Sequence, residues 1–168
     1  MTVAQKKEQA TAWRRTAIET SPGKAREVEK PIRRWAGAAG ITHAILRIGA
    51  GLLFFMHGAP KLLGWFGGMG PDGGSAELLS LMGLAGVLEV FGGLAIALGV
   101  FTRPVAAVLA LEMLIAYFYA HVPRGTVPYV NGGELALLYA CVWVFLAGNG
   151  AGPFSVDRAL AARKAVNR

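Results

Sequence analysis

The 168-residue sequence contains one cysteine, Cys141. It therefore forms no intrachain disulfide and cannot by itself carry out dithiol chemistry of the C-x-x-C kind. The glycine-rich stretch 64–74 lacks the Gly-Lys-Ser/Thr step of a phosphate-binding loop, so we interpret it as a tight turn. We also predict no cleavable leader, because the first 40 residues form a long polar tail and no small-residue cleavage site follows them. We therefore expect the first apolar segment to be retained.

Acidic residues are few, and 10 Asp and Glu against 17 Lys and Arg give a net charge of +7. Nine of the seventeen basic residues lie in residues 1–34 and four more follow residue 150, whereas Lys61 and Arg124 are alone in the predicted outer connections. This asymmetry is the positive-inside pattern, and it places both termini in the cytoplasm. Topology and attraction to anionic membrane lipid account for the basic balance, so no nucleic-acid partner is predicted.

Long polar stretches are missing between residues 41 and 150, and apolar residues make up 54% of the chain. The apolar runs are about 20 residues long, which is enough to cross roughly 30 Å of hydrocarbon. A soluble fold would have too little polar sequence to coat such a core. The fold class predicted is therefore all-α, an integral membrane four-helix transmembrane bundle. Its spans are expected at about 41–60, 77–100, 104–121 and 133–147, between a charged N-terminal tail (1–40) and a basic C-terminal tail (151–168).

Three of the spans carry an ionisable residue at a similar depth, namely Arg47, Glu89 and Glu112. At 1.5 Å per residue, Arg47 lies roughly 9 Å and Glu112 roughly 12 Å from the cytoplasmic end. Charges inside a bilayer usually face a partner or a watery cavity, so we predict that these three residues meet. An arginine between two carboxyls would leave one of them protonated, as a proton relay requires. The alternative is an interhelical ion pair that fixes helix register.

A second polar group is predicted at the outer end of the bundle. His57 and Lys61 lie on one face of the first span, and Glu134 begins the fourth span at the same height. These three residues are the catalytic candidates, and they suit a quinone-like or anionic group at the membrane surface. No diagnostic spacing for a metal site is present, so no metal is predicted.

His121 ends the third span at the height of His57, and it is the cofactor-binding candidate. Two histidines on facing helices can hold haem. However, His121 is nine residues from Glu112, about 180° around a helix, so both face the bundle centre only if the helix unwinds locally. The orientation of His121 on the opposite side of the helix from Glu112 therefore argues against haem. The alternatives are interfacial histidines that bind loop carbonyls, and a metal held by His57 and Glu134.

Several short motifs occur together between residues 41 and 160, and in combination they resemble the DoxX family. The motifs are Arg47-Ile48-Gly49-x-Gly51-Leu52-Leu53-Phe54-x-x-His57-Gly58-x-x-Lys61-Leu62, Glu89-x-x-Gly92-Gly93-Leu94, Leu98-Gly99-x-x-Thr102-Arg103, Asn131-Gly132-Gly133-Glu134-Leu135-Ala136-Leu137-Leu138-Tyr139 and Gly150-x-Gly152-x-Phe154-Ser155-x-Asp157. The resemblance implies a four-helix protein of the cytoplasmic membrane. It also implies a link to redox chemistry, since the family is named for its similarity to a membrane subunit of thiosulfate:quinone oxidoreductase.

The leading hypothesis for function is a membrane subunit of a redox system. In it, the group His57, Lys61 and Glu134 contacts a quinone or a small sulfur or anionic substrate, and the group Arg47, Glu89 and Glu112 manages protons or structure. If the protein is an enzyme, it is a quinone-linked oxidoreductase subunit with a redox partner protein or a second copy of itself. The alternative is a non-catalytic scaffold or small-solute permease whose charges hold helices together or line a path.

Overall fold

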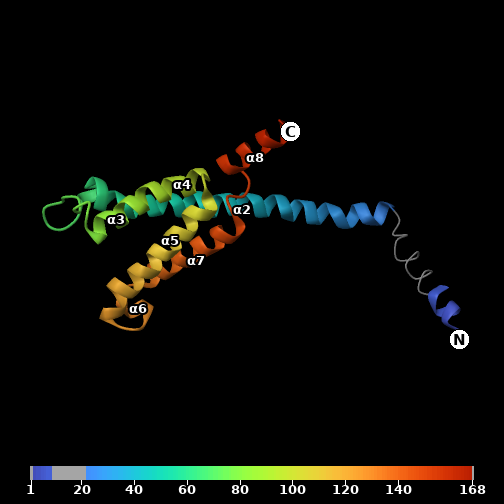
Figure 1. Ribbon diagram of the computed structural model, residues 1–168, viewed down its shortest axis with the longest axis horizontal. Helices are drawn as coiled ribbons and strands as arrows, with labels where there is room; N and C mark the ends of the chain where they lie inside the picture. The colour runs from blue at the N-terminus through green and yellow to red at the C-terminus, as the bar shows by residue number, and fades with distance from the viewer. Residues whose placement is uncertain (1, 9–21, 168) are drawn as a thin grey trace. The chain divides into compact units, whose positions relative to one another are not determined.

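The computed structural model describes residues 2–8 and 22–167, which fall into two compact units, Met1–Ala39 and Gly40–Arg168. Of the predicted N-terminal tail, residues 1 and 9–21 lie outside the described residues. The second unit carries the motifs. The elements are α2 (Pro22–Leu63), η1 (Trp65–Gly67), α3 (Leu81–Val87), η2 (Leu88–Gly92), α4 (Gly93–Leu98), α5 (Thr102–Ala116), η3 (Tyr117–His121), η4 (Val122–Arg124), α6 (Pro128–Asn131), α7 (Glu134–Asn149) and α8 (Val156–Val166) (Figure 1).

The fold is that of an all-α membrane protein, as predicted. Three helices are long and apolar enough to cross a bilayer, Gly37–Leu63, Leu81–Leu98 and Thr102–Arg124, and no strand occurs in the described residues. The fourth apolar helix, α7, has 16 residues and is about 24 Å long. Its role as a fourth span remains a prediction.

The second span begins later than expected. Its helix starts at Leu81 and not near residue 77, and Ser80 is its N-terminal cap. The Ser80 hydroxyl accepts a hydrogen bond from the Gly83 amide at 3.0 Å, which satisfies one of the free amides of the first turn. Residues 76–80 therefore belong to the connection, and α3, η2 and α4 follow one another as a single helix with a π-helical turn in its middle.

Glycines allow α2 and the α3–α4 helix to touch backbone to backbone. A Cβ on Gly51 would lie 2.6 Å from the Gly93 carbonyl oxygen, and one on Gly58 would lie 2.7 Å from Glu89 Cβ. Small residues promote such close packing inside membranes, where apolar side chains gain nothing by leaving lipid. One turn further along, Gly86 faces the Lys61 Cβ. The close approach therefore places the side chains of Lys61 and Glu89 at the same level.

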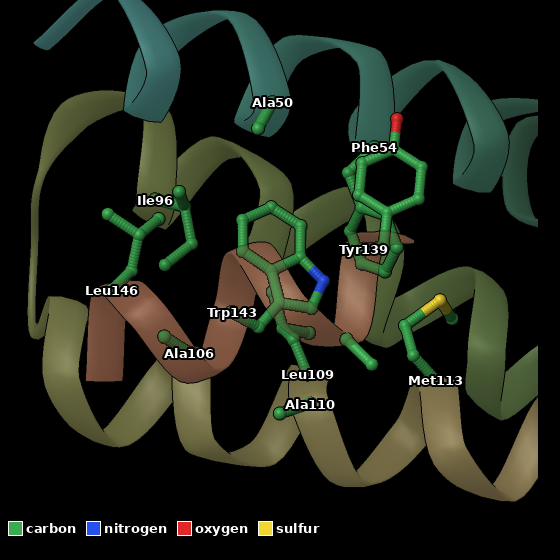
Figure 2. Packing of buried hydrophobic residues seen from close by; sticks show 11 residues of the cluster. Ala50, Phe54, Ile96, Ala106, Leu109, Ala110, Met113, Tyr139, Trp143 and Leu146 are labelled. Carbon is green, nitrogen blue, oxygen red and sulfur yellow. The ribbon is translucent and has the colours of Figure 1, made fainter. Parts of the chain in front are cut away.

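Helices α5 and α7 form the other half of the bundle, side by side and antiparallel (Figure 1). Trp143 of α7 is fully buried between α2 and α5, with its ring 5.0 Å from that of Phe54 (Figure 2). Tyr139, one turn earlier, stacks on Trp143 at 5.6 Å. These aromatic rings separate two ends of the bundle, which we call the α6 end and the α8 end after the short helices there.

Candidate functional site

Five polar or ionisable side chains line a cavity of about 290 Å³ near the α6 end. Its polar walls come from all four of the predicted spans, and Phe54 and Met113 supply apolar surface. The full lining is Phe54, His57, Lys61, Glu89, Met113, Ala116, His121, Gly132, Leu135, Ala136 and Tyr139. Residues from both predicted groups therefore meet in one place.

An ion pair between α2 and η2 forms one wall of this cavity. Lys61 Nζ lies 2.6 Å from Glu89 Oε1, and the two side chains are 21% and 4% exposed. The second carboxylate oxygen, Glu89 Oε2, is buried and has no hydrogen-bond partner among the described residues. Glu89 was predicted to meet Arg47, but the structure pairs it with Lys61. Lys61 lies near the end of α2, but its long side chain reaches inward to Glu89. The sequence argument compared only the depths of residues along their helices and did not include this reach.

Two π-helical turns carry Glu89 and His121 into the lining. Glu89 is the second residue of η2, and His121 is the last residue of η3. A π-helix closes i to i+5 hydrogen bonds and turns less per residue than an α-helix, and such turns often occur at functional sites. This is the local unwinding that the sequence argument required before His121 could face inward. It brings His121 to the same cavity as His57.

The hydrogen bond of His121 determines which of its two ring nitrogens is available to a ligand. His121 Nδ1 lies 3.2 Å from the Asn131 carbonyl oxygen, and a carbonyl only accepts, so Nδ1 carries the proton. In the neutral ring, Nε2 is then an acceptor that is available to a ligand. His57 contacts the ring of Tyr139 edge-on at 5.8 Å. The cavity thus presents two imidazoles, a phenol, an ammonium and a carboxylate.

Three of the predicted site residues, Glu134, Glu112 and Arg47, do not line the cavity. Glu134 is exposed in the first turn of α7. Glu112 is half-buried on α5, within electrostatic reach of Glu89 and Lys61, and both of its carboxyl oxygens are buried without a hydrogen-bond partner among the described residues. Glu112 therefore lies within electrostatic reach of Glu89, and Arg47 is not the cation between them.

Arg47 lies towards the α8 end and is fully buried. Its guanidinium donates to the carbonyl oxygens of Ile96 (2.7 Å) and Ala97 at the end of α4 and to that of Phe154 (2.8 Å). The C-terminus of a helix carries partial negative charge and free carbonyl groups, so it can stabilise a buried cation. Arg47 therefore links α2 to the end of α4 and to the loop before α8. It does not line the 290 Å³ cavity.

Asp157 is a structural residue to which sequence reasoning assigned no role. Its carboxylate accepts hydrogen bonds from the amides of Phe101 and Thr102, both at 2.9 Å, and its own amide donates to the Gly99 carbonyl. The free amides at the start of α5 are thereby capped by a residue 55 positions later in the chain. The signal was present in the sequence as Thr102-Arg103 and Ser155-x-Asp157, but their spacing gave no sign that they meet.

Comparison with known proteins places the chain in a family. The DoxX family pattern matches residues 42–122. An uncharacterized protein from Haemophilus influenzae is 40% identical over 118 residues, which cover 68% of this chain and 87% of that relative. The chain belongs to the DoxX family. No solved structure matches this DoxX protein. The matched segment holds Arg47, His57, Lys61, Glu89 and His121 and ends before α7, which supplies Tyr139.

Acidification is expected to weaken this DoxX protein through Asp157. Partial burial favours the protonated acid, but the amides of Thr102 and Phe101 and the charge of Arg47 outweigh it and hold the pKa of Asp157 below its ordinary value. The unfolded chain then binds the proton more readily than the folded one. The stability contributed by Asp157 is therefore fully present above the ordinary pKa of about 3.9 and is lost as the pH falls through the folded pKa.

Thermal melts of the purified protein in neutral detergent between pH 7 and pH 2.5 measure this effect. Asp157→Asn should melt earlier than wild type at pH 7 and should lose less on acidification. Asp72→Asn, in the exposed loop before α3, is the matched control and should keep the wild-type profile. An unchanged acid transition in Asp157→Asn would contradict the assignment.

Proposed function

We propose that the 290 Å³ cavity binds the head group of a membrane quinone and that this DoxX protein is the membrane subunit of a redox system. The observation that carries the proposal is Glu89. It is 97% buried, it lines the cavity, and one of its oxygens has no partner among the described residues. A buried acceptor of this kind is costly unless a donor reaches it, so a ligand with a hydroxyl group would stabilise the site.

The lining matches both forms of a quinone. The carbonyl oxygens of an oxidised quinone only accept hydrogen bonds, and Lys61 Nζ and the Tyr139 hydroxyl can donate to them. The hydroxyls of the reduced form can donate to Glu89 Oε2 and His121 Nε2. Reduction consumes two electrons and two protons per ring. Lys61, Glu89 and the histidines can pass the protons, and a redox partner protein supplies the electrons, because the single Cys141 provides no dithiol.

The same proposal places the protein in the cytoplasmic membrane with both termini inside. The support is the charge pattern, since nine basic residues precede residue 35 and four follow residue 150. With this orientation the cavity opens near the outer surface, within about two turns of the end of α2 at Leu63. A quinone head group resides at that depth when its tail remains in the hydrocarbon layer.

Binding of a short-chain ubiquinone to the purified protein is the direct test. Trp143 stacks on Tyr139, so its fluorescence reports on the cavity. His57→Leu and Tyr139→Phe each remove a polar group from the lining and should weaken binding on the order of tenfold, as expected when a hydrogen bond of about 1.4 kcal/mol is lost. Glu134→Gln lies outside the cavity and should bind as wild type does.

Several results would count against the proposal. Failure of the wild-type protein to bind ubiquinone would contradict the quinone proposal. Equal binding by wild type and by a stable His57→Leu variant would contradict it as well. Loss of binding in Glu134→Gln but not in Tyr139→Phe would move the site to the start of α7. Competition by thiosulfate that depends on Lys61 would instead identify a small sulfur anion as the ligand, and binding of neither probe would favour the scaffold.

A further inference from the structure

A second cavity, of about 640 Å³, lies at the α8 end. The start of α5, the loop 149–155 and the first turns of α8 enclose it, and Figure 1 shows α8 beside the turn between α4 and α5. Two arginines line it, Arg103 from α5 and Arg158 from α8. The quinone hypothesis makes no use of this cavity, because the aromatic core lies between the two ends.

The positive charge of this cavity is only partly compensated. Neither Arg103 nor Arg158 forms an ion pair within the part of the chain that the structure describes. The one carboxylate in the lining, Asp157, already accepts two amide hydrogen bonds at the start of α5. One carboxylate against two guanidinium groups leaves the lining with an excess of positive charge, so the wall is electropositive.

The loop is shaped to keep Arg103 in place. A Cβ on Gly150 would lie 3.1 Å from Arg103 Nε, so the arginine packs across the glycine backbone. Gly150 also has φ 77°, a conformation that other residues seldom adopt. Ser155 caps α8 by accepting the Arg158 amide at 3.2 Å, which fixes where that helix begins. Both arginines thus project from anchored backbone.

The position of the cavity indicates what kind of anion it meets. Thr102 begins a helix that is long and apolar enough to span a membrane, so the cavity lies at a membrane surface. Large apolar side chains are exposed beside it, with Phe154 73% and Leu160 50% exposed. Such side chains favour contact with acyl chains, and guanidinium groups bind phosphate oxygens in a bidentate manner.

We propose that this cavity binds the phosphate of an anionic phospholipid, with Arg103 and Arg158 on the phosphate and Phe154 and Leu160 against the acyl chains. The bound lipid links the start of α5 to α8 and holds α8 on the membrane surface. Its binding weakens with salt, because two basic side chains supply most of the attraction.

Native mass spectrometry of the full chain in neutral detergent, titrated with phosphatidylglycerol, tests this proposal. Phosphatidylcholine with the same acyl chains should bind more weakly than phosphatidylglycerol. The double variant Arg103→Gln/Arg158→Gln should bind phosphatidylglycerol on the order of tenfold more weakly than wild type. Arg163→Gln/Lys164→Gln is the matched control, because it also removes two positive charges, but at residues of α8 that do not line the cavity, and it should bind as wild type does.

Other outcomes overturn the proposal. Equal losses in the double variant and its control would reduce the effect to general surface charge. Glycerol phosphate binding as tightly as the lipid would identify a soluble phosphate ligand instead. If the double variant does not fold, Arg158→Gln alone serves, because its exposed side chain makes no other contact with a charged partner in the described chain, and wild-type lipid affinity in it would remove Arg158 from the site.

Discussion

Lys61→Met is expected to destabilise the folded protein by about 3–5 kcal/mol, because it leaves a buried carboxylate without its cation. Glu89 is 3% exposed, and Lys61 is its one hydrogen-bond partner among the described residues. Methionine keeps most of the apolar length of lysine, so the change tests the charge and not the packing. Unfolding in mixed micelles of mild detergent and SDS, followed by tryptophan fluorescence, measures the free energy.

Adding Glu89→Gln to Lys61→Met should recover most of that loss, because the unpaired charge is then removed. A double-mutant cycle isolates this coupling. Arg47→Leu combined with Glu89→Gln serves as the control, and there the two losses should add, since Arg47 and Glu89 share no partner. Additive losses in the Lys61/Glu89 cycle, with coupling in the Arg47/Glu89 cycle, would restore the cluster that depth along the helices predicted.

The fold could be read from the sequence because apolar length and charge asymmetry are local signals. Span length follows from bilayer thickness, and the stripe of His57 and Lys61 follows from the helical period. The boundary at Ser80 was missed because Ser75 and Ser80 are both acceptable cap residues, and residue type alone does not distinguish them. Regular helices were predictable, and the choice between equivalent ends was not.

The site was only half predictable, because it depends on departures from regular helices. The π-helical turns η2 and η3 rotate Glu89 and His121 towards the cavity, and no residue pattern in the sequence signalled them. The partner of Arg47 was missed for a different reason. A charge inside a membrane suggests a partner of opposite charge, but Arg47 binds backbone carbonyl oxygens instead. Every residue has a backbone carbonyl, so the sequence does not indicate which of them will bind an arginine.

Arg47→Leu should destabilise the protein by about 3–5 kcal/mol, the largest loss expected at the α8 end. Hydrogen bonds from a charged donor contribute about 1.5–3 kcal/mol each, and the guanidinium donates to three carbonyl oxygens. Leucine would leave the carbonyls of Ala97 and Phe154 facing an apolar side chain. The same micelle unfolding experiment measures the loss, and Arg124→Leu, in an exposed turn at the α6 end, should change little.

Arg47→Lys separates charge from geometry at this position. Lysine keeps the positive charge, but its single ammonium cannot span carbonyls that belong to both α4 and the loop before α8, so it should recover only part of the stability. Because Arg47 lies outside the 290 Å³ cavity, the fraction of Arg47→Lys that remains folded should bind ubiquinone with wild-type affinity. Full recovery of stability by lysine would show that charge alone matters. Loss of quinone affinity in a stable Arg47→Lys variant would connect the two ends of the bundle and return Arg47 to the functional site.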